Sequence, residues 1–391
     1  MAECIAVVNA GSSSVKFAFY DRAGEQPLLL KGQVEQIGVS PSLTASGPDG
    51  ADLVERSWPA EGFGHAQAMK AILEVARELL AGSTVKGVGH RVVHGGTKFA
   101  TPVEVNEGII AELEELSPLA PLHQPHNLGP IKAIAHGAPE IRQVACFDTA
   151  FHQSQPHIAQ TFALPRELTD AGVRRYGFHG LSYDFVSGRL AEVAPELADR
   201  KIIIAHLGNG ASVCAIHQGR SVATTMGFTA VDGLMMGTRC GSIDPGVLIY
   251  LMDERGMDAR ALENLVYKQS GLLGVSGISS DMRTLRQSDD PKAAEAIALF
   301  IYRIVREIGS LSAALGGLDG LVFTGGIGQR DAKTRREVAA GCAWLGAELD
   351  EGRNNAGEGL ISSDSSRLPI WVIATDEERV MARQTAAVLG I

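Results

Sequence analysis

Two distant segments of the chain share one pattern, and this weak internal repeat constrains the fold more than any other feature. Residues 7–20 (VVNAGSSSVKFAFY) and 205–219 (AHLGNGASVCAIHQG) each read as a strand, a turn of Gly, Ser and Asn, and a second strand. A third glycine turn, TGGIG at 324–328, follows an apolar strand and precedes a helix. The spacing is too long for a solenoid repeat. It predicts two related lobes with a cleft between them.

Strand and helix patterns are interspersed along the whole chain, which predicts α/β layers. Apolar residues at steps of three or four predict helices over 65–81, 292–315 and 377–389. The polar, turn-rich segment 38–57 is interpreted as a peripheral hairpin or flap. Short apolar runs rich in β-branched residues predict strands at 4–8, 15–20, 88–93, 143–147, 201–207, 212–216, 320–326 and 370–374.

Composition excludes several classes of protein. The 391 residues include 35 Lys and Arg against 45 Asp and Glu, and a net charge of −10 gives no general basic surface for nucleic acid. Five scattered cysteines without a CxxC pair suit a reducing cytosol. The N-terminus lacks the pattern of a signal peptide, and the most apolar stretch, 293–315, is interrupted by charges. We therefore expect a cytoplasmic protein that binds neither nucleic acid nor membrane.

The glycine turns are candidate phosphate-binding sites. NAGSSSVK (9–16) concentrates backbone N–H groups, hydroxyls and an ammonium at one strand–strand turn, although it is not a Walker P-loop and could be an ordinary Ser-rich hairpin. HLGNGAS (206–212) and TGGIG (324–328) each follow an apolar strand, where glycine lets the backbone approach a pyrophosphate or purine. Three such turns in one chain favour ATP.

Charged residues at the ends of predicted strands are candidates for catalysis. In HRVVHGG (90–96), Arg91 could hold a carboxylate through two hydrogen bonds, and Val93 is expected on the same face of the strand. A surface ion pair is the alternative for Arg91. Further candidates are Asp148 in FDTAFH (147–152), His179 in RRYGFHG (174–180), Arg239 in MMGTRCGSIDP (235–245) and the acidic cluster of ATDEER (374–379). That cluster could equally begin a helix, with Asp376 as its N-cap.

Taken together, these motifs resemble the acetate kinase family, within the acetate and sugar kinase, Hsp70 and actin superfamily. The matching stretches occur in the family's order and span almost the whole chain: VVNAGSSSVKF, HRVVHGG, APLHQPHNLGPI, FDTAFHQ, RRYGFHG, HLGNGASV, MGFTAVDGLMMGTRCGSIDP, TGGIG and ATDEE. The resemblance implies the duplicated actin-like ATPase (RNase H-like) α/β fold, with a nucleotide cleft between an N-terminal lobe (1–149 plus 378–391) and a nucleotide-binding lobe (150–377). It also implies a homodimer.

The resemblance implies reversible phosphorylation of acetate by ATP to give acetyl phosphate and ADP, with Mg²⁺, or Mn²⁺ in its place. The roles that it implies for individual residues are as follows: catalysis by Asp148, His179 and Arg239; acetate binding by Arg91, Val93, Leu122 and Phe178; metal binding by Asn9 and Glu377; phosphate binding by Ser12, Ser14, Lys16, His206, Leu207, Gly208, Asn209 and Gly210; adenosine binding by Asp281, Met282, Arg283, Gly326, Ile327, Gly328, Gln329 and Arg330.

The chain departs from the family's usual motifs at several positions. GIGEN is GIGQR here, HGGE is HGGT, FHGTSH is FHGLSY, GFTPLEG is GFTAVDG and TRSGDIDP is TRCGSIDP. The changes include those at Thr97, Leu181, Tyr183, Ala230, Cys240, Ser242, Gln329 and Arg330. None of these changes removes a principal catalytic residue. They bear on nucleotide preference and on the size of the acyl group.

Three other functions remain open from the sequence. The first is a kinase for propionate or another short-chain acid, which the volume of the acyl pocket would decide. The second is an ATPase of the chaperone or actin type, which would not need Arg91. The third is a metallohydrolase built on His90, His94, His123 and His126. The combination of Arg91, His179 and Arg239 favours the kinase.

Overall fold

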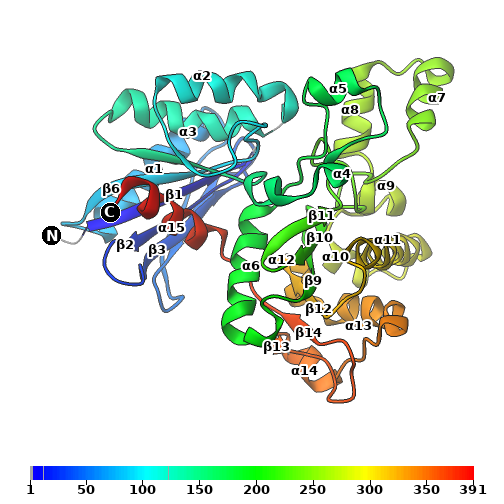
Figure 1. Ribbon diagram of the computed structural model, residues 1–391. Helices are drawn as coiled ribbons and strands as arrows, with labels where there is room; N and C mark the ends of the chain where they lie inside the picture. Colours follow the sequence, from blue (N-terminus) through cyan, green and yellow to red (C-terminus); the bar gives the residue numbers. More distant parts are fainter. Residues whose placement is uncertain (1–2, 12, 122) are drawn as a thin grey trace. The chain divides into compact units, whose positions relative to one another are not determined.

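The computed structural model describes residues 3–11, 13–121 and 123–391. Ser12 and Leu122, which the resemblance placed in the phosphate and acetate sites, lie outside the described residues. Contacts between residues divide the chain into two compact units (Figure 1). The first comprises Met1–Ala150 and Asp376–Ile391, and the second comprises Phe151–Thr375.

The first unit is built on an eight-stranded sheet in the order β5-β4-β3-β2-β1-β6-β8-β7. Strands β1, β2 and β3 form an antiparallel meander, and β6 and β8 continue the sheet parallel to β1. The strands are β1 (Glu3–Ala10), β2 (Val15–Asp21), β3 (Leu28–Glu35), β4 (Ser42–Ser46), β5 (Asp52–Ser57), β6 (Thr84–Val92), β7 (Val103–Glu104) and β8 (Gln143–Phe147).

Helices cover both faces of this sheet, and the alternation of side chains along β6 assigns them. Val88 packs into the core beneath α1 (His65–Leu79), whereas Gly87 and Gly89 face α15 (Glu377–Leu389). A Cβ on Gly89 would lie 2.3 Å from Thr385 Oγ1, so glycine is required for this close approach. Arg91 follows in the same alternation and therefore lies on the face of α15. Helices α2 (Glu107–Glu115) and α3 (Gln124–Gly137) complete the unit.

The second unit repeats the strand order of the first on a smaller scale. Its six-stranded sheet has the order β11-β10-β9-β12-β14-β13. Strands β9, β10 and β11 form an antiparallel meander, and β12 and β14 lie parallel to β9, as β6 and β8 do to β1. The duplication predicted from the glycine turns is confirmed. The strands are β9 (Lys201–Leu207), β10 (Ala211–His217), β11 (Arg220–Thr224), β12 (Gly320–Thr324), β13 (Gly359–Leu360) and β14 (Ile370–Val372).

Two long helices flank this second sheet (Figure 1). Helix α6 (Gly180–Val193) buries Tyr183, Val186 and Leu190 against apolar residues of β9, β10 and β12. Helix α11 (Pro291–Leu315) packs against β10 and β11, and its Asp290 cap accepts a hydrogen bond from the backbone of Lys292. The other α-helices are α4 (His157–Gln160), α5 (Arg166–Asp170), α7 (Pro245–Arg255), α8 (Ala259–Lys268), α9 (Gly271–Ser276), α10 (Met282–Arg286), α12 (Gly325–Arg330), α13 (Ala332–Gly341) and α14 (Glu351–Ala356).

The predicted elements are confirmed apart from their ends, with one informative difference. Segment 38–57 contains the edge hairpin β4–β5, as the turn-rich sequence indicated. The strand predicted to continue to residue 326 instead ends at Thr324, because Gly325 has a φ of 77° and the following residues form α12. A Cβ at Gly325 would also meet the backbone of Leu207 at 2.6 Å. Among the described residues, no helix is both long and apolar enough to cross a membrane.

Candidate active site

In the first unit, the polar candidates gather where parallel strands end. Asn9 lies near the end of β1, Arg91 near the end of β6, and Asp148 directly after β8. These three strands are adjacent and parallel. Their carboxyl ends therefore lie along one edge of the sheet, where α/β proteins commonly bind ligands.

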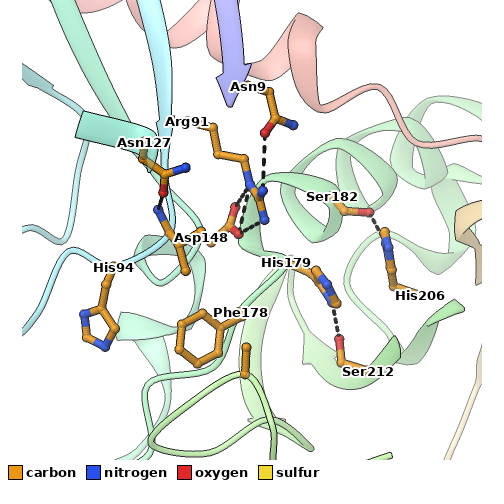
Figure 2. A network of polar contacts seen from close by, with 12 residues as sticks. Asn9, Arg91, His94, Asn127, Asp148, Phe178, His179, Ser182, His206 and Ser212 are labelled. Atoms are coloured by element: carbon orange, nitrogen blue, oxygen red, sulfur yellow. Dashed lines mark hydrogen bonds and ion pairs between the residues drawn. The ribbon is translucent and has the colours of Figure 1, made fainter. Parts of the chain in front are cut away.

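Arg91 is the centre of this group (Figure 2). Its Nε lies 3.1 Å and its Nη2 lies 2.5 Å from Asp148 Oδ2, and its Nη1 lies 3.3 Å from Asn9 Oδ1. Asp148 is fully buried. Burial acts to lower the pKa of Arg91, but the carboxylates of Asp148 and Glu377 outweigh it and raise that pKa overall. Arg91 therefore remains a cation whose plane is fixed by Asp148 and Asn9.

Glu377 adds a second acidic group at the start of α15. The preceding residue, Asp376, caps the helix by accepting a hydrogen bond of 2.9 Å from the backbone N–H of Arg379, so the predicted cap is confirmed. The pKa of Glu377 is raised to about 7, chiefly because burial disfavours its charged form; the Asp148 carboxylate also acts to raise this pKa, whereas Arg91 acts to lower it. A half-buried carboxyl group next to another carboxylate would be stabilised in its ionised form by an added cation.

The donor chemistry of this group fits Mg²⁺. Asn9 offers an amide oxygen and Glu377 a carboxylate, which are the oxygen ligands that a hard divalent cation prefers. Mg²⁺ commonly takes only one or two protein ligands and completes its octahedron with water and phosphate oxygens. The two oxygen donors of Asn9 and Glu377, with the Asp148 carboxylate nearby, would therefore be enough to hold Mg²⁺.

The turn after β1 is held in place by groups that the sequence analysis did not identify. Gly11 N–H donates to Ser14 O at 2.8 Å, and His65 Nε2 lies 2.7 Å from Gly11 O. The buried Asn127 donates to Ala10 O at 2.6 Å and accepts from Val93 N at 2.9 Å. A buried Asn on a helix gives no sequence signal for this role, because only the fold shows that it bridges two strand ends.

Two predicted ligands in this unit differ in exposure. Val93 is buried but lies one residue beyond the end of β6, so its place on the face of Arg91 stays a prediction. Its backbone N–H donates to Asn127 Oδ1 at 2.9 Å. Lys16, by contrast, is exposed on β2 directly after the turn. An exposed ammonium there is available to an anion.

The four histidines of the metallohydrolase alternative are used in other ways. His90 is buried within β6, His94 Nδ1 accepts a hydrogen bond from Gly96 N at 2.9 Å, and the ring of His126 stacks on that of His65 at 5.0 Å. His123 is the residue before α3. Within the described residues, no three His, Cys, Asp or Glu side chains gather so that they could hold a metal ion.

In the second unit, His179 is positioned by its backbone, by a hydrogen bond at Nδ1 and by stacking on one face of its ring. It precedes α6 with a φ of 60°, a left-handed conformation that is uncommon outside glycine. Its Nδ1 lies 2.8 Å from Ser212 Oγ, and its ring stacks on His206 at 4.4 Å. His206 Nδ1 is in turn 2.8 Å from Ser182 Oγ (Figure 2). A strained backbone with this many supports is typical of functional residues.

Arg239 lies close to His179 around the second glycine turn. Arg239 Nη1 donates to Ala230 O at 2.7 Å. A Cβ added to Gly210 would lie 3.2 Å from His179 Nε2 and 3.3 Å from Arg239 Nη2. Both nitrogens therefore face the turn that joins β9 to β10. Two N–H donors beside a turn rich in backbone N–H groups form an arrangement suited to phosphate oxygens.

Phe178 is buried next to His179, and its carbonyl is anchored by a second histidine. His152 Nε2 donates to Phe178 O at 2.9 Å, and burial lowers the pKa of His152 to about 4. The ring is therefore neutral, and its Nδ1 lies 2.9 Å from Ser221 Oγ. Gly177, with a φ of 78°, leaves no room for a Cβ beside this ring. The contact with His152 and the close packing at Gly177 thus fix the loop that carries Phe178 and His179.

The third glycine turn is held by a buried arginine. Arg335 donates to the carbonyls of Gly328 and Gln329 at 2.9 and 2.7 Å and to Asn354 Oδ1 at 2.8 Å. These contacts satisfy carbonyls at the end of α12 that have no helical partner. Gly326 and Arg330 remain exposed.

The other predicted adenosine ligands lie at the start of α10. Asp281 caps this helix and pairs with the exposed Arg283, with Arg283 Nη2 at 2.6 Å from Asp281 Oδ2. Met282 is buried. Only Asp281 and Arg283 of this segment therefore present side chains at the surface.

The two sheets with one strand order define a duplicated actin-like ATPase fold, and polar groups at the strand ends are typical of the kinases in that class. The acetokinase family model matches residues 4–383, and the chain belongs to this family. An acetate kinase of Rhodopseudomonas palustris (strain TIE-1) is 52% identical over 389 residues, covering 98% of each chain.

Solved structures give the same result. An acetate kinase of Porphyromonas gingivalis is 40% identical, with a TM-score of 0.87 over 99% of this chain and 100% of its own. A propionate kinase of Francisella tularensis is 36% identical, with a TM-score of 0.91 over the same shares. Both acyl substrates are thus represented among relatives of similar structure.

Proposed function

We propose that the protein transfers the γ-phosphoryl group of ATP to acetate, reversibly, to give acetyl phosphate and ADP. The observation that carries this proposal is the pairing of Arg91 with the buried Asp148. A fixed guanidinium at a strand end is suited to a carboxylate substrate, and a conformational ATPase would have no use for it.

In this reaction, an acetate oxygen attacks the γ-phosphorus while the bond to the β–γ bridging oxygen breaks, and ADP leaves with the electron pair. Acetate is already ionised at neutral pH, so no group needs to remove a proton. The barrier is the approach of an anion to a polyanion, and positioning and charge stabilisation lower it. Asp148 accordingly orients Arg91 and does not act as a general base.

The other residues take the roles that the likeness to the family implies. Arg91 holds the acetate carboxylate, and Val93 and Phe178 contact its methyl group. His179 and Arg239 donate to the phosphoryl oxygens, which carry the charge of the transition state. Ser14, Lys16 and the turn 206–210 bind phosphates of the nucleotide. Asp281, Arg283 and residues 326–330 contact the adenosine, with Met282 contributing through its backbone.

Asn9 and Glu377 would hold Mg²⁺ through oxygen ligands. When bound, the ion offsets negative charge on the nucleotide phosphates. Lys16 contributes a further positive charge from β2.

The proposal is tested by an assay that traps acyl phosphate as its hydroxamate, with formate, acetate, propionate and butyrate as acceptors. We expect ATP-dependent product with acetate. Slow ATP hydrolysis that no carboxylate stimulates would instead identify an ATPase. Activity with zinc but without ATP would identify a hydrolase.

We predict that acetate exceeds propionate by about ten- to a hundredfold in kcat/KM, because one methylene in an apolar pocket changes discrimination by about 1 to 3 kcal/mol. The buried, branched Val93 favours a methyl group, whereas Ala230 removes volume where the family usually has Pro. Val93→Ala should lower the acetate:propionate ratio of kcat/KM, and Ala230→Pro should raise it.

Val88→Ala provides the matched control for this prediction. Val88 lies in β6, five residues before Val93, and packs in the core against α1, so its truncation should lower stability without changing the acetate:propionate ratio. If the wild-type protein uses propionate better than acetate, the propionate kinase alternative is correct.

We predict weak discrimination between nucleotide bases. Gln329 and Arg330 replace the usual Glu and Asn, so a carboxylate is lost and an exposed cation gained at the third glycine turn. The ATP:GTP ratio of kcat/KM should be below about a thousandfold, or roughly 4 kcal/mol. The double substitution Gln329→Glu/Arg330→Asn should raise the ATP:GTP ratio. Arg336→Ala, at an exposed ion pair with Glu351, is the control that should leave it unchanged.

We also propose a homodimer, in which α7 is part of the interface. This helix has no buried residue, and Ile249, Tyr250 and Met252 are 58%, 50% and 50% exposed. Clustered large apolar side chains on a surface helix mark an interaction site. Sedimentation at micromolar concentration should give a dimer for the wild type and a monomer for Ile249→Glu/Tyr250→Glu. Leu73→Glu, at an exposed leucine of α1, should remain dimeric. A monomeric wild type would contradict the proposal.

A further inference from the structure

Three hydroxyl and imidazole groups of the second unit form a chain that ends at His179. Tyr183 Oη lies 2.5 Å from Ser212 Oγ, and Ser212 Oγ lies 2.8 Å from His179 Nδ1. Tyr183 lies one turn into α6, and its backbone N–H donates to His179 O at 3.1 Å. Ser212 is the second residue of β10. Tyr183 and Ser212 are both fully buried. Tyr183 also occupies one of the positions at which the chain departs from the family's usual motif.

The direction of these hydrogen bonds follows from the acidity of the groups. A phenol is a stronger acid than an aliphatic alcohol, so Tyr183 is the better donor and Ser212 the acceptor between them. Burial raises the pKa of Tyr183 well above its ordinary value, and the phenol therefore keeps its proton. Ser212 can then direct its own O–H at His179 Nδ1. Successive hydrogen bonds of this kind polarise and strengthen one another.

An imidazole that accepts at Nδ1 carries its proton on Nε2 when it is neutral. Nε2 is the nitrogen beside the Gly210 turn, where Arg239 Nη2 also lies. The titratable groups near the ring include His206 on one face, Arg239 near Nε2 and Tyr183 through Ser212, with Cys214 close to Tyr183.

We infer that Tyr183 is a positioning residue which, through Ser212, holds His179 as the Nε2–H tautomer, so that His179 donates to a phosphoryl oxygen. This role rests on the proposed phosphoryl transfer. The tautomer itself can be observed without any activity.

The first test is ¹⁵N nuclear magnetic resonance of the histidine rings in the full-length protein, with the His179 signals assigned by their loss in His179→Gln. In the wild type, we expect a neutral ring protonated at Nε2. Tyr183→Phe keeps the ring that packs on Phe151 and His152 but removes the hydroxyl. It should shift the His179 signals towards a mixture of tautomers. A wild-type ring protonated at Nδ1, or unchanged signals in Tyr183→Phe, would overturn the inference.

The second test is a double-mutant cycle on kcat. Tyr183→Phe should lower kcat about three- to tenfold, with the KM for acetate and for ATP changed by less than about twofold. Ser212→Ala should lower kcat at least as much. Adding Tyr183→Phe to Ser212→Ala should then have no further effect, because Tyr183 acts only through Ser212. Additive losses would show that Tyr183 has a merely structural role.

Tyr176→Phe is the matched control. Tyr176 is also buried, and its hydroxyl donates to Gly172 O at 2.8 Å. Its loss should leave the His179 signals and kcat unchanged. If the protein makes no acyl phosphate, the proposed function fails while the tautomer measurement still decides the structural part. If the enzyme is active and the tautomer does not respond, only the inference about Tyr183 fails.

Discussion

Replacing Arg91 with alanine is expected to lower kcat/KM for acetate by a factor of about 10² to 10³, which corresponds to on the order of 3 to 4 kcal/mol of transition-state stabilisation. Because Arg91 is proposed to hold the acetate carboxylate, the loss should fall mainly on KM. The structure adds a second consequence, because Arg91 is the partner of the fully buried Asp148. Removing one member of such a pair leaves an uncompensated charge and costs about 3 to 5 kcal/mol of stability. We therefore expect Arg91→Ala to lower both activity and thermal stability.

Two variants separate these effects. Arg91→Met/Asp148→Asn removes both charges and should regain much of the lost stability but none of the activity. Lys98→Ala breaks an exposed pair with Glu112, whose Oε2 lies 3.2 Å from Lys98 Nζ. Surface pairs contribute about 0 to 1 kcal/mol to stability, so this control should leave thermal stability and kcat/KM nearly unchanged. Near-normal kcat/KM in Arg91→Ala would disprove the assignment of the acetate site.

Replacing Arg239 with alanine is expected to lower kcat by about 10² to 10³, with much smaller changes in KM and stability. Arg239 Nη1 donates to the backbone carbonyl of Ala230 at 2.7 Å, and this partner carries no charge. Its main loss would fall on the transition state, where charge on the phosphoryl oxygens needs a donor. Steady-state kinetics with acetate and ATP, together with thermal unfolding, measure both quantities.

Arg239→Lys tests whether charge or geometry matters. Lysine keeps the positive charge but lacks the planar guanidinium, so it should recover only a small part of kcat. Arg220→Ala, at an exposed residue of β11 in the same unit, should retain full activity. If kcat is normal in Arg239→Ala, the phosphoryl contact belongs to another residue.

The sequence predicted the fold well because its signals were local. The apolar runs at 143–147 and 201–207 and the capped helix at 377–389 coincide with β8, β9 and α15. The two glycine turns also predicted the duplication, since the same strand–turn–strand unit recurs at the same place in each sheet. The end of a strand was harder to predict where the conformation of one glycine ends it, as Gly325 does for β12.

The candidate site was predictable in its residue types but not in its contacts. A strand-end arginine and an aspartate after a strand could be picked out from the chain, yet nothing in their spacing showed that Arg91 and Asp148 pair. Supporting groups such as Asn127, Ser212 and Arg335 carried no signal at all. Their roles depend on which distant backbone or side chain the fold brings next to them, and a local pattern contains no such information.

The path of the chain has a consequence for biosynthesis. Helix α15 belongs to the first unit but follows the whole of the second unit in the sequence. While a ribosome is still making the second unit, the face of β6 with Gly87 and Gly89 has no helix to cover it, and Glu377 does not yet exist. Domains generally fold as they emerge, N-terminal first. The first unit of the nascent polypeptide therefore keeps one face of its sheet uncovered until translation of the second unit is finished. Glu377, the proposed metal ligand, becomes available only then.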